Sequence, residues 1–204
     1  MIRVRDDDVL LRSSSYEDEL GRLKQVHGWI CEAPDTLIHV PAILVLEIQE
    51  FPEAIEYIRQ ETAEGRMLPE IHGLSHKDYA NLSEKEIQAD LNVCRDWIDY
   101  KFGHVATKFY TPWGAGEDDR GAHIKPAAAA IGIEVVTCEH INKLQGRYGV
   151  CQLLKDGHPL SYFDGGEIFM HWWEGGSRLK RVVEVAKHGS WEAAKKENRR
   201  LFSD

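Results

Sequence analysis

Two histidines and a run of three aspartates are the residues of this sequence whose types and spacing best suit chemistry. His72 and His76 stand four positions apart, and Asp6, Asp7 and Asp8 are consecutive near the start. A carboxylate and two imidazoles form a ligand set that proteins use for catalytic zinc-type ions, with a fourth position left for water. The sequence therefore indicates a metal-dependent hydrolase.

The segments around the histidines place them at the end of a strand. Residues 67–71 have a strand pattern, and Gly73 allows a sharp turn where that strand ends. Ser83 and Glu86 then form a capping-box pattern that opens a helix. His72 would thus lie at the carboxyl end of a strand, where barrel and open-sheet enzymes keep their chemistry. Because the motif alone is short, two surface histidines in a loop remain the alternative.

Length and charge limit the classes of function. The 204 residues suit a single domain, 1–204, with a full core. Lys plus Arg number 25 and Asp plus Glu 34, and the resulting net charge of -9 argues against nucleic acid as the main partner. No apolar run reaches the length of a membrane span, and no signal-peptide pattern opens the sequence. We therefore expect a soluble, cytoplasmic protein.

Strand and helix patterns alternate along the chain. The predicted strands cover residues 2–9, 37–44, 67–71, 106–113, 133–138 and 166–173. The predicted helices cover residues 16–27, 51–64, 84–102, a segment around 127–130, and most of 178–202 with a break at 188–190. This alternation predicts right-handed parallel connections, and hence an α/β fold that is either a barrel or an open sheet.

Four segments follow one another in an order that resembles a known family. They are Asp6-Asp7-Asp8, residues 72–76, the loop 109–114 and residues 169–171. The polysaccharide deacetylases of carbohydrate esterase family 4, or chitooligosaccharide-deacetylase homology domain, carry an Asp-Asp pair, a His-x-x-x-His motif, an Arg-Pro-Pro-Tyr-Gly-like loop and a late Leu-x-His in this order. The resemblance, over residues 2–173, implies a single-domain distorted (β/α) barrel of about seven parallel strands.

The resemblance also implies roles for individual residues. Asp8, His72 and His76 would hold one divalent metal ion, with zinc expected first, although cobalt, nickel or iron also suit these ligands. Asp7 would be the general base that takes a proton from the attacking water, and His171 the general acid that protonates the leaving group.

Further residues of the loop and of the last predicted strand would meet the substrate. By position in the family's pattern, Trp113 would offer its backbone N–H to the oxyanion that forms during the reaction. Tyr110, Pro112 and Trp172 are expected to contact the sugar, and Trp172 could stack on it.

The sequence departs from the family's pattern at two places. Tyr110 replaces the loop arginine that pairs with the catalytic aspartate, and Gly73 replaces a residue with a hydroxyl. Arg5 lies two residues before Asp7, hence on the same strand face, and we hypothesise that it supplies the missing charge. In a regular strand Asp7 faces opposite to its neighbours, so Asp6 and Asp8 would be the working pair unless the strand ends or bulges there.

We therefore expect a metal-dependent deacetylase that removes an N- or O-linked acetyl group from a sugar or glycan precursor during glycan assembly. Its partner would be the acetylated sugar, and the sequence leaves the oligomeric state open. One alternative is a non-catalytic module of the same fold that binds metal or carbohydrate, which the two departures favour. Another is a metal hydrolase that acts on a different bond.

Overall fold

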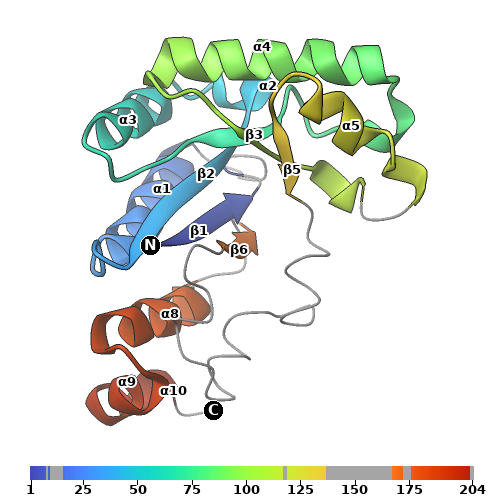
Figure 1. The fold of residues 1–204 in the computed structure, drawn as a ribbon. Coiled ribbons are helices and arrows are strands. Elements are labelled where there is room, and N and C mark those ends of the chain that lie inside the picture. Colours follow the sequence, from blue (N-terminus) through green and yellow to red (C-terminus); the bar gives the residue numbers. More distant parts are fainter. Residues whose placement is uncertain (8, 10–15, 117–118, 137–166, 172–175, 203–204) are drawn as a thin grey trace.

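A curled sheet of parallel strands forms the centre of the protein, shown in Figure 1. This computed structural model describes residues 1–7, 9, 16–116, 119–136, 167–171 and 176–202. The strand order is β5-β4-β3-β2-β1-β6, and every neighbouring pair runs parallel. The strands are β1 (Ile2–Asp7), β2 (Leu37–Leu44), β3 (Glu70–Gly73), β4 (Lys108–Tyr110), β5 (Glu134–Val136) and β6 (Glu167–His171).

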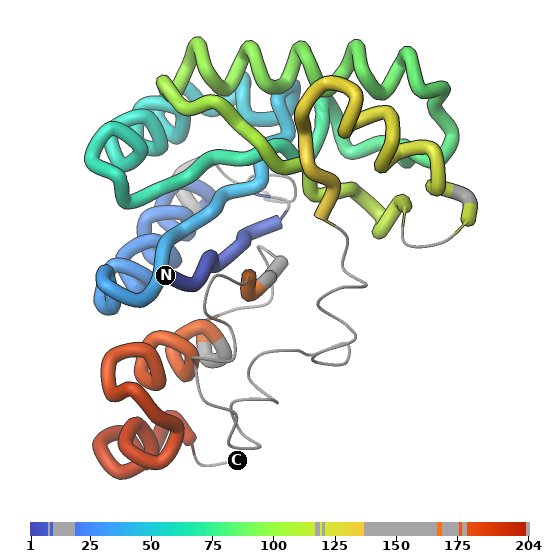
Figure 2. The backbone as a smooth tube through the Cα atoms, in the orientation of Figure 1, coloured from blue at the N-terminus to red at the C-terminus, as the bar shows by residue number. Residues whose placement is uncertain are grey.

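Helices lie around the outside of this sheet (Figure 1). The α-helices are α1 (Tyr16–Ile30), α2 (Val45–Ile48), α3 (Pro52–Ala63), α4 (Glu84–Phe102), α5 (Ile124–Ala129), α8 (Gly176–His188), α9 (Trp191–Glu197) and α10 (Arg199–Phe202). Short 3-10 turns are η1 (Tyr79–Asn81), η2 (Pro112–Gly114) and η3 (Asp119–Gly121). In Figure 2, α8, α9 and α10 gather as one group beneath α1, and α8 packs against α1. None of the helices in the described ranges is long and apolar enough to cross a membrane.

The two faces of the sheet bury different side chains, because successive residues of a strand point to opposite sides. The outer face, which the helices cover, carries Ile43, Ile71 and Phe109, and these pack with the apolar stripe of α4 in one large core cluster. The inner face carries Val40 and Ala42, which form a smaller cluster with Tyr110. Burying each large apolar side chain contributes on the order of 2 kcal/mol, so the helix-covered face supplies most of the stabilisation.

The parallel α/β architecture predicted from sequence is confirmed, with six strands in the described residues. Strand β2 and helix α4 have the predicted bounds, and α4 begins with the predicted capping box of Ser83 and Glu86. The third strand begins at Glu70, later than predicted, because Pro69 has no N–H to donate to a ladder. The fourth is shorter than predicted, since η2 begins at Pro112.

Candidate active site

Arg5 and Asp7 form a buried ion pair on the inner face of β1. The Arg5 Nε donates to Asp7 Oδ1 at 2.8 Å, and Nη2 donates to the second carboxylate oxygen. The two residues are only 1% and 3% exposed. Such a two-point contact fixes both planar groups, and it offsets the cost of burying two charges. Arg5 and Asp7 therefore share a strand face, as the alternation predicted, and the guanidinium lies where it can orient the carboxylate.

Asp6 points to the opposite side of β1. Its Oδ2 lies 3.6 Å from Nε2 of His39, on the outer face, and both residues are 0% exposed. The pleat of β1 is thus regular through Asp7, where the strand ends. Asp8, the predicted metal ligand, lies outside the described residues. Asp6 therefore lies on the face away from Arg5, and Asp7 lies on the same face as Arg5.

Tyr110 lies directly against Arg5. The centre of its ring is 4.5 Å from the guanidinium carbon, and its hydroxyl donates to Glu167 Oε1 at 2.7 Å. Burial, reinforced by the Glu167 carboxylate, raises the pKa of the Tyr110 phenol, which therefore stays protonated. The residue is 0% exposed. Pro112, like Tyr110 predicted to contact the sugar, is buried as well.

Glu167, at the start of β6, makes several polar contacts on the inner face of the sheet. The sequence did not predict it as a site residue. Its Oε1 accepts from Tyr110 and from Lys108 Nζ, the latter at 2.6 Å, and lies 3.4 Å from Arg3 Nη1. Its partners on β4 lie 57 and 59 positions away in the sequence, so no local pattern marked it. Because β4 and β6 are not neighbours in the sheet, these contacts also show that the sheet curls enough to bring the two strands together.

His72 lies at the carboxyl end of β3, as predicted, and its ring is held in one tautomer. Its Nδ1 donates to the Tyr110 carbonyl oxygen at 2.7 Å. Since a carbonyl oxygen only accepts, Nδ1 carries the proton, and Nε2 is then the nitrogen with the lone pair of the neutral ring. A backbone carbonyl bonded to the second ring nitrogen is a usual support of a metal-binding histidine.

Gly73 explains one departure from the family's pattern. Its φ of +137° is a conformation that residues with a Cβ rarely adopt. A Cβ at this position would also lie 2.9 Å from the hydroxyl oxygen of Tyr79. That hydroxyl instead accepts a hydrogen bond from the backbone N–H of Leu74. Tyr79 therefore holds the turn between His72 and His76 and leaves no room for a side chain at residue 73.

His76 stands between His72 and Trp113. The centre of its ring lies 5.5 Å from that of His72 and 4.7 Å from that of Trp113. The Trp113 Nε1 donates to the His76 carbonyl oxygen at 3.3 Å. Trp113 is 65% exposed and has a φ of +60°, which is strained for a bulky residue. An exposed, strained aromatic residue thus borders the two predicted metal-binding histidines.

The residues present fit a metal ion in part. His72 and His76 are close together, and the Tyr110 carbonyl favours the ligating form of His72. In the ranges that the structure describes, no group of three or more His, Cys, Asp or Glu side chains could hold a metal ion. The predicted third ligand, Asp8, falls outside those ranges.

Two predicted residues of the last strand are placed only in part. The backbone of His171 ends β6 and lies in register with Asp7 of β1. The predicted acid and base therefore sit on adjacent strands at the same edge of the sheet. The His171 side chain and all of Trp172 lie outside the described part of the chain.

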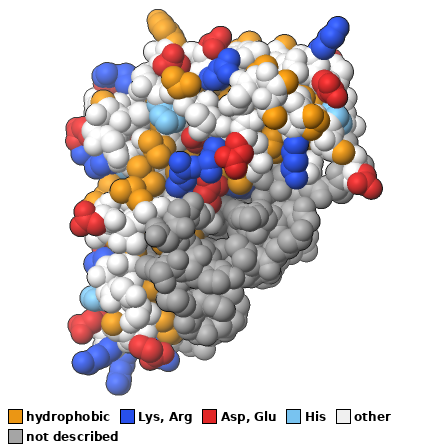
Figure 3. All heavy atoms as spheres, in the orientation of Figure 1, with side chains coloured by type: hydrophobic (Ala, Val, Ile, Leu, Met, Phe, Trp, Pro, Cys, Tyr) orange, Lys and Arg blue, Asp and Glu red, His pale blue; other side chains and the backbone are white. Residues whose placement is uncertain are grey.

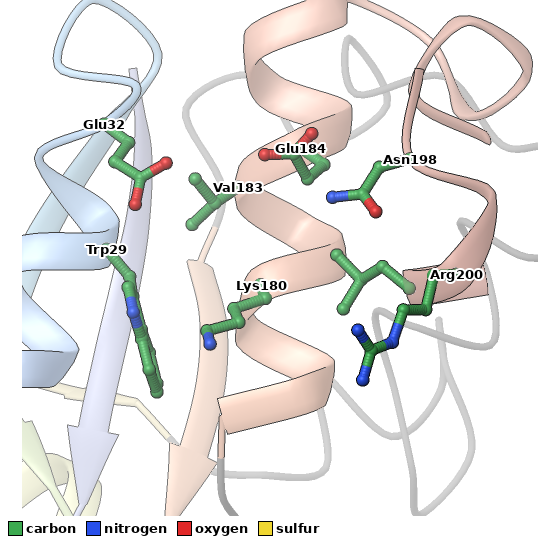
Figure 4. Close-up of a pocket in the computed structure, with 8 residues that line it drawn as sticks. Trp29, Glu32, Lys180, Val183, Glu184, Asn198 and Arg200 are labelled. Carbon is green, nitrogen blue, oxygen red and sulfur yellow. The ribbon is translucent and has the colours of Figure 1, made fainter. Parts of the chain in front are cut away.

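A separate pocket of about 310 Å³ lies between α1 and the C-terminal helices, shown in Figure 4. There Lys180 lies over the ring of Trp29, 4.5 Å from its centre. None of the candidate active-site residues whose side chains the structure describes lines this pocket. On the described part of the face in Figure 3, basic and acidic side chains are interspersed rather than gathered by sign.

Comparison with known proteins agrees with this geometry. Residues 41–136 match the family model described as polysaccharide deacetylase. This segment includes both predicted metal-binding histidines and the loop that carries Trp113. No curated protein matches the sequence.

Several solved structures share the fold at low sequence identity. A family 4 carbohydrate esterase from Streptomyces lividans, in complex with acetate, has a TM-score of 0.56 and 18% identity, with 92% of this chain and 88% of that one covered. The peptidoglycan deacetylase PdaC from Bacillus subtilis has a TM-score of 0.54 and 17% identity, with 97% and 91% covered. A family 4 pseudoenzyme from Bacillus anthracis has a TM-score of 0.58 and 12% identity, with 91% and 59% covered. The sequence match over residues 41–136 and the shared fold support the assignment of this chain to the polysaccharide deacetylase family.

Proposed function

We propose that the protein is a metal-dependent deacetylase that hydrolyses an N- or O-linked acetyl group on a sugar or glycan precursor. One observation carries the proposal: Tyr110 contacts both halves of the site. Its ring lies against Arg5, which holds Asp7, and its carbonyl oxygen accepts from His72. A carboxylate and an imidazole, each fixed by a partner, therefore flank one buried residue at the end of the sheet.

In this proposal, Asp7 is the general base. A general base must be correctly directed toward the water, and the two-point contact with Arg5 fixes the direction of the Asp7 carboxylate. His72, His76 and Asp8 would hold the metal ion, with zinc the first candidate. When bound, such an ion lowers the pKa of water and polarises the acetyl carbonyl.

The remaining roles fall to the last strand and to the loop. His171, in register with Asp7 on the adjacent strand, would donate a proton to the leaving amine or alkoxide. The Trp113 backbone N–H would donate to the developing oxyanion, and the strained φ of Trp113 supports a functional role for this turn. The exposed Trp113 ring next to His76 could also pack against a sugar.

A second candidate function is a non-catalytic module that binds carbohydrate or metal. The replacement of the family's loop arginine by Tyr110 favours it, and the solved structures of the same fold include a pseudoenzyme. The Arg5–Asp7 pair argues in the other direction, since it restores a guanidinium next to the aspartate.

Acetate release distinguishes the two candidates. The purified protein would be incubated with acetylated chito-oligosaccharides, acetylated xylo-oligosaccharides and peptidoglycan fragments, each with chelator, with added zinc and with added cobalt. We expect acetate from at least one substrate, loss of the activity with chelator and recovery with metal. The Asp7→Asn variant serves as the inactive control. Metal bound tightly with no acetate from any substrate would favour the binding module.

A further inference from the structure

Asp7 is oriented by Arg5, and Arg5 itself must be oriented by something, because a free arginine side chain samples many rotamers. Two contacts in the structure restrain its guanidinium. The edge that carries Nε and Nη2 meets the Asp7 carboxylate, and the guanidinium carbon lies over the Tyr110 ring. The ring can restrain the guanidinium only if the ring is itself fixed.

Tyr110 is fixed at both ends. Its backbone belongs to β4 and pairs with Val136 of β5, and its hydroxyl donates to Glu167 of β6. Three strands, β3, β2 and β1, lie between β4 and β6 in the sheet. The hydrogen bond therefore crosses the interior of the curled sheet and does not simply join neighbouring strands.

Glu167 is held in turn by charge. Lys108 donates to the same Oε1 atom at 2.6 Å, and Arg3 lies 3.4 Å from it. The Glu167 side chain is only 7% exposed, so these contacts are weakly screened by solvent. Side chains of β1 and β4 thus meet at the Glu167 carboxylate of β6. This carboxylate accepts the hydrogen bond from the Tyr110 hydroxyl and so fixes the ring that lies against Arg5.

We propose that Glu167 and Tyr110, together the brace, are positioning residues that hold the Arg5 guanidinium against Asp7. The brace rests on the proposed function, because its purpose is to direct the general base. It explains how a chain with tyrosine at the family's arginine position can keep a guanidinium on the aspartate. The guanidinium belongs to Arg5 of β1, and Tyr110, at the family's arginine position, supports it through its ring.

The test compares Tyr110→Phe with wild type. The phenylalanine ring stays under Arg5 but cannot donate to Glu167, so the change removes one hydrogen bond and little volume. We expect kcat to fall about tenfold, with KM and bound zinc within about twofold of wild type, because misplacement of a catalytic group lowers kcat. Tyr57→Phe, a change of the same kind on α3, should leave kcat unchanged.

A second variant tests whether the effect passes through Glu167. Glu167→Gln should lower kcat to a similar extent, and the double variant with Tyr110→Phe should be no worse than the more impaired single variant. Effects that multiply in the double variant would mean that the two residues act separately, which overturns the proposal. Because Glu167→Gln leaves Lys108 and Arg3 less compensated, its thermal unfolding is measured first. Tyr110→Phe alone decides the matter if the glutamine variant does not fold.

A readout without turnover separates the brace from the proposed function. The Arg5 Nε–H donates to Asp7, so its proton NMR signal, assigned by its loss in Arg5→Lys, should exchange slowly with water. We expect exchange to be at least about fivefold faster in Tyr110→Phe than in wild type or Tyr57→Phe. Slow exchange retained in Tyr110→Phe, or an unchanged kcat, would overturn the brace. If the wild type releases no acetate but exchange is still faster in Tyr110→Phe, the brace stands and only the proposed deacetylase function fails.

Discussion

Two polar clusters lie on opposite faces of the sheet. The consecutive aspartates Asp6 and Asp7 belong to different clusters. The inner cluster comprises Arg5, Asp7, His72, Tyr110 and Glu167. The outer cluster comprises the buried Asp6, His39 and His27 together with the partly exposed Glu61 and Arg66. In the outer cluster, His39 and His27 approach through their Nδ1 atoms at 3.3 Å, and His27 Nε2 lies 2.9 Å from Glu61, which also binds Arg66.

The two clusters contain similar residue types but have different roles. The hydrogen bonds of the outer cluster tie β2 to α1 and α1 to α3, and Asp6 of β1 lies 3.6 Å from His39. The inner cluster extends from Glu167, at the start of β6, to Asp7 and His72 near the carboxyl ends of their strands. His76 and the exposed Trp113 follow there. Burial of a histidine and a carboxylate does not by itself mark an active site. What distinguishes the inner cluster is that it reaches the carboxyl end of the strands, where substrates of α/β proteins usually bind.

The largest expected effect contrasts the two neighbouring aspartates. Asp7→Asn should lower kcat by about 10³, since a general base typically contributes 10²–10⁴. Asp6→Asn, on the other face, should change kcat by less than about threefold, because it acts only through packing. Acetate release under saturating substrate measures both. If Asp6→Asn proved the more damaging, the assignment of the two faces would be reversed.

Removal of the guanidinium should have the next largest effect. Arg5→Met should lower kcat by about 10² while bound metal stays unchanged, because the carboxylate loses its two-point contact. Adding Tyr110→Arg to this variant returns a guanidinium to the family's loop position, and we expect part of the lost kcat to return. Metal analysis gives the bound metal, and acetate release gives kcat. An unaltered kcat in Arg5→Met would exclude the hypothesis that Arg5 supplies the missing charge beside Asp7.

Acid stability should depend on the outer cluster. Burial lowers the pKa of His39 to about 3, and burial together with His39 lowers that of His27 to about 4. Both values lie below the 6.5 of an unfolded chain, so the unfolded state takes up protons first as pH falls. The free energy of unfolding should therefore decrease from about pH 6.5 toward pH 4, by on the order of 3 kcal/mol per histidine.

Urea unfolding at several pH values tests this expectation. His39→Asn should show a shallower loss of stability between about pH 6.5 and 4.5, since one of the two buried rings no longer titrates. His188→Asn, at an exposed position, should keep the wild-type slope. Equal slopes in all three proteins would mean that carboxylates alone govern the acid response.

The smallest expected effect concerns strain in the loop. Trp113→Gly should raise the free energy of unfolding by about 1 kcal/mol, because glycine adopts a positive φ without strain. It should lower kcat at the same time, because the ring against His76 is lost. Thermal unfolding and acetate release on one preparation compare the two. A variant that gains stability and keeps full kcat would remove Trp113 from the site.

Much of the framework followed from sequence because it rests on local signals. Alternation placed Arg5 and Asp7 on one face of β1, and Gly73 marked the turn after His72. The role of Tyr110 could not be predicted, because its motif resembled a loop while its side chain is buried under Arg5. Glu167 was missed since its partners on β4 come near only through the curl of the sheet, which no local pattern encodes.

The contacts of the Glu167 carboxylate also bear on the order in which the structure folds. Its contacts reach back 57 and 59 positions to β4 and 164 positions to β1. Contacts that close such long loops form late during folding, since chain entropy opposes them until the rest of the structure is in place. A partly folded chain can therefore pair Arg5 with Asp7, yet the support beneath that pair arrives only when β6 docks, so catalytic competence should be the last property the molecule acquires.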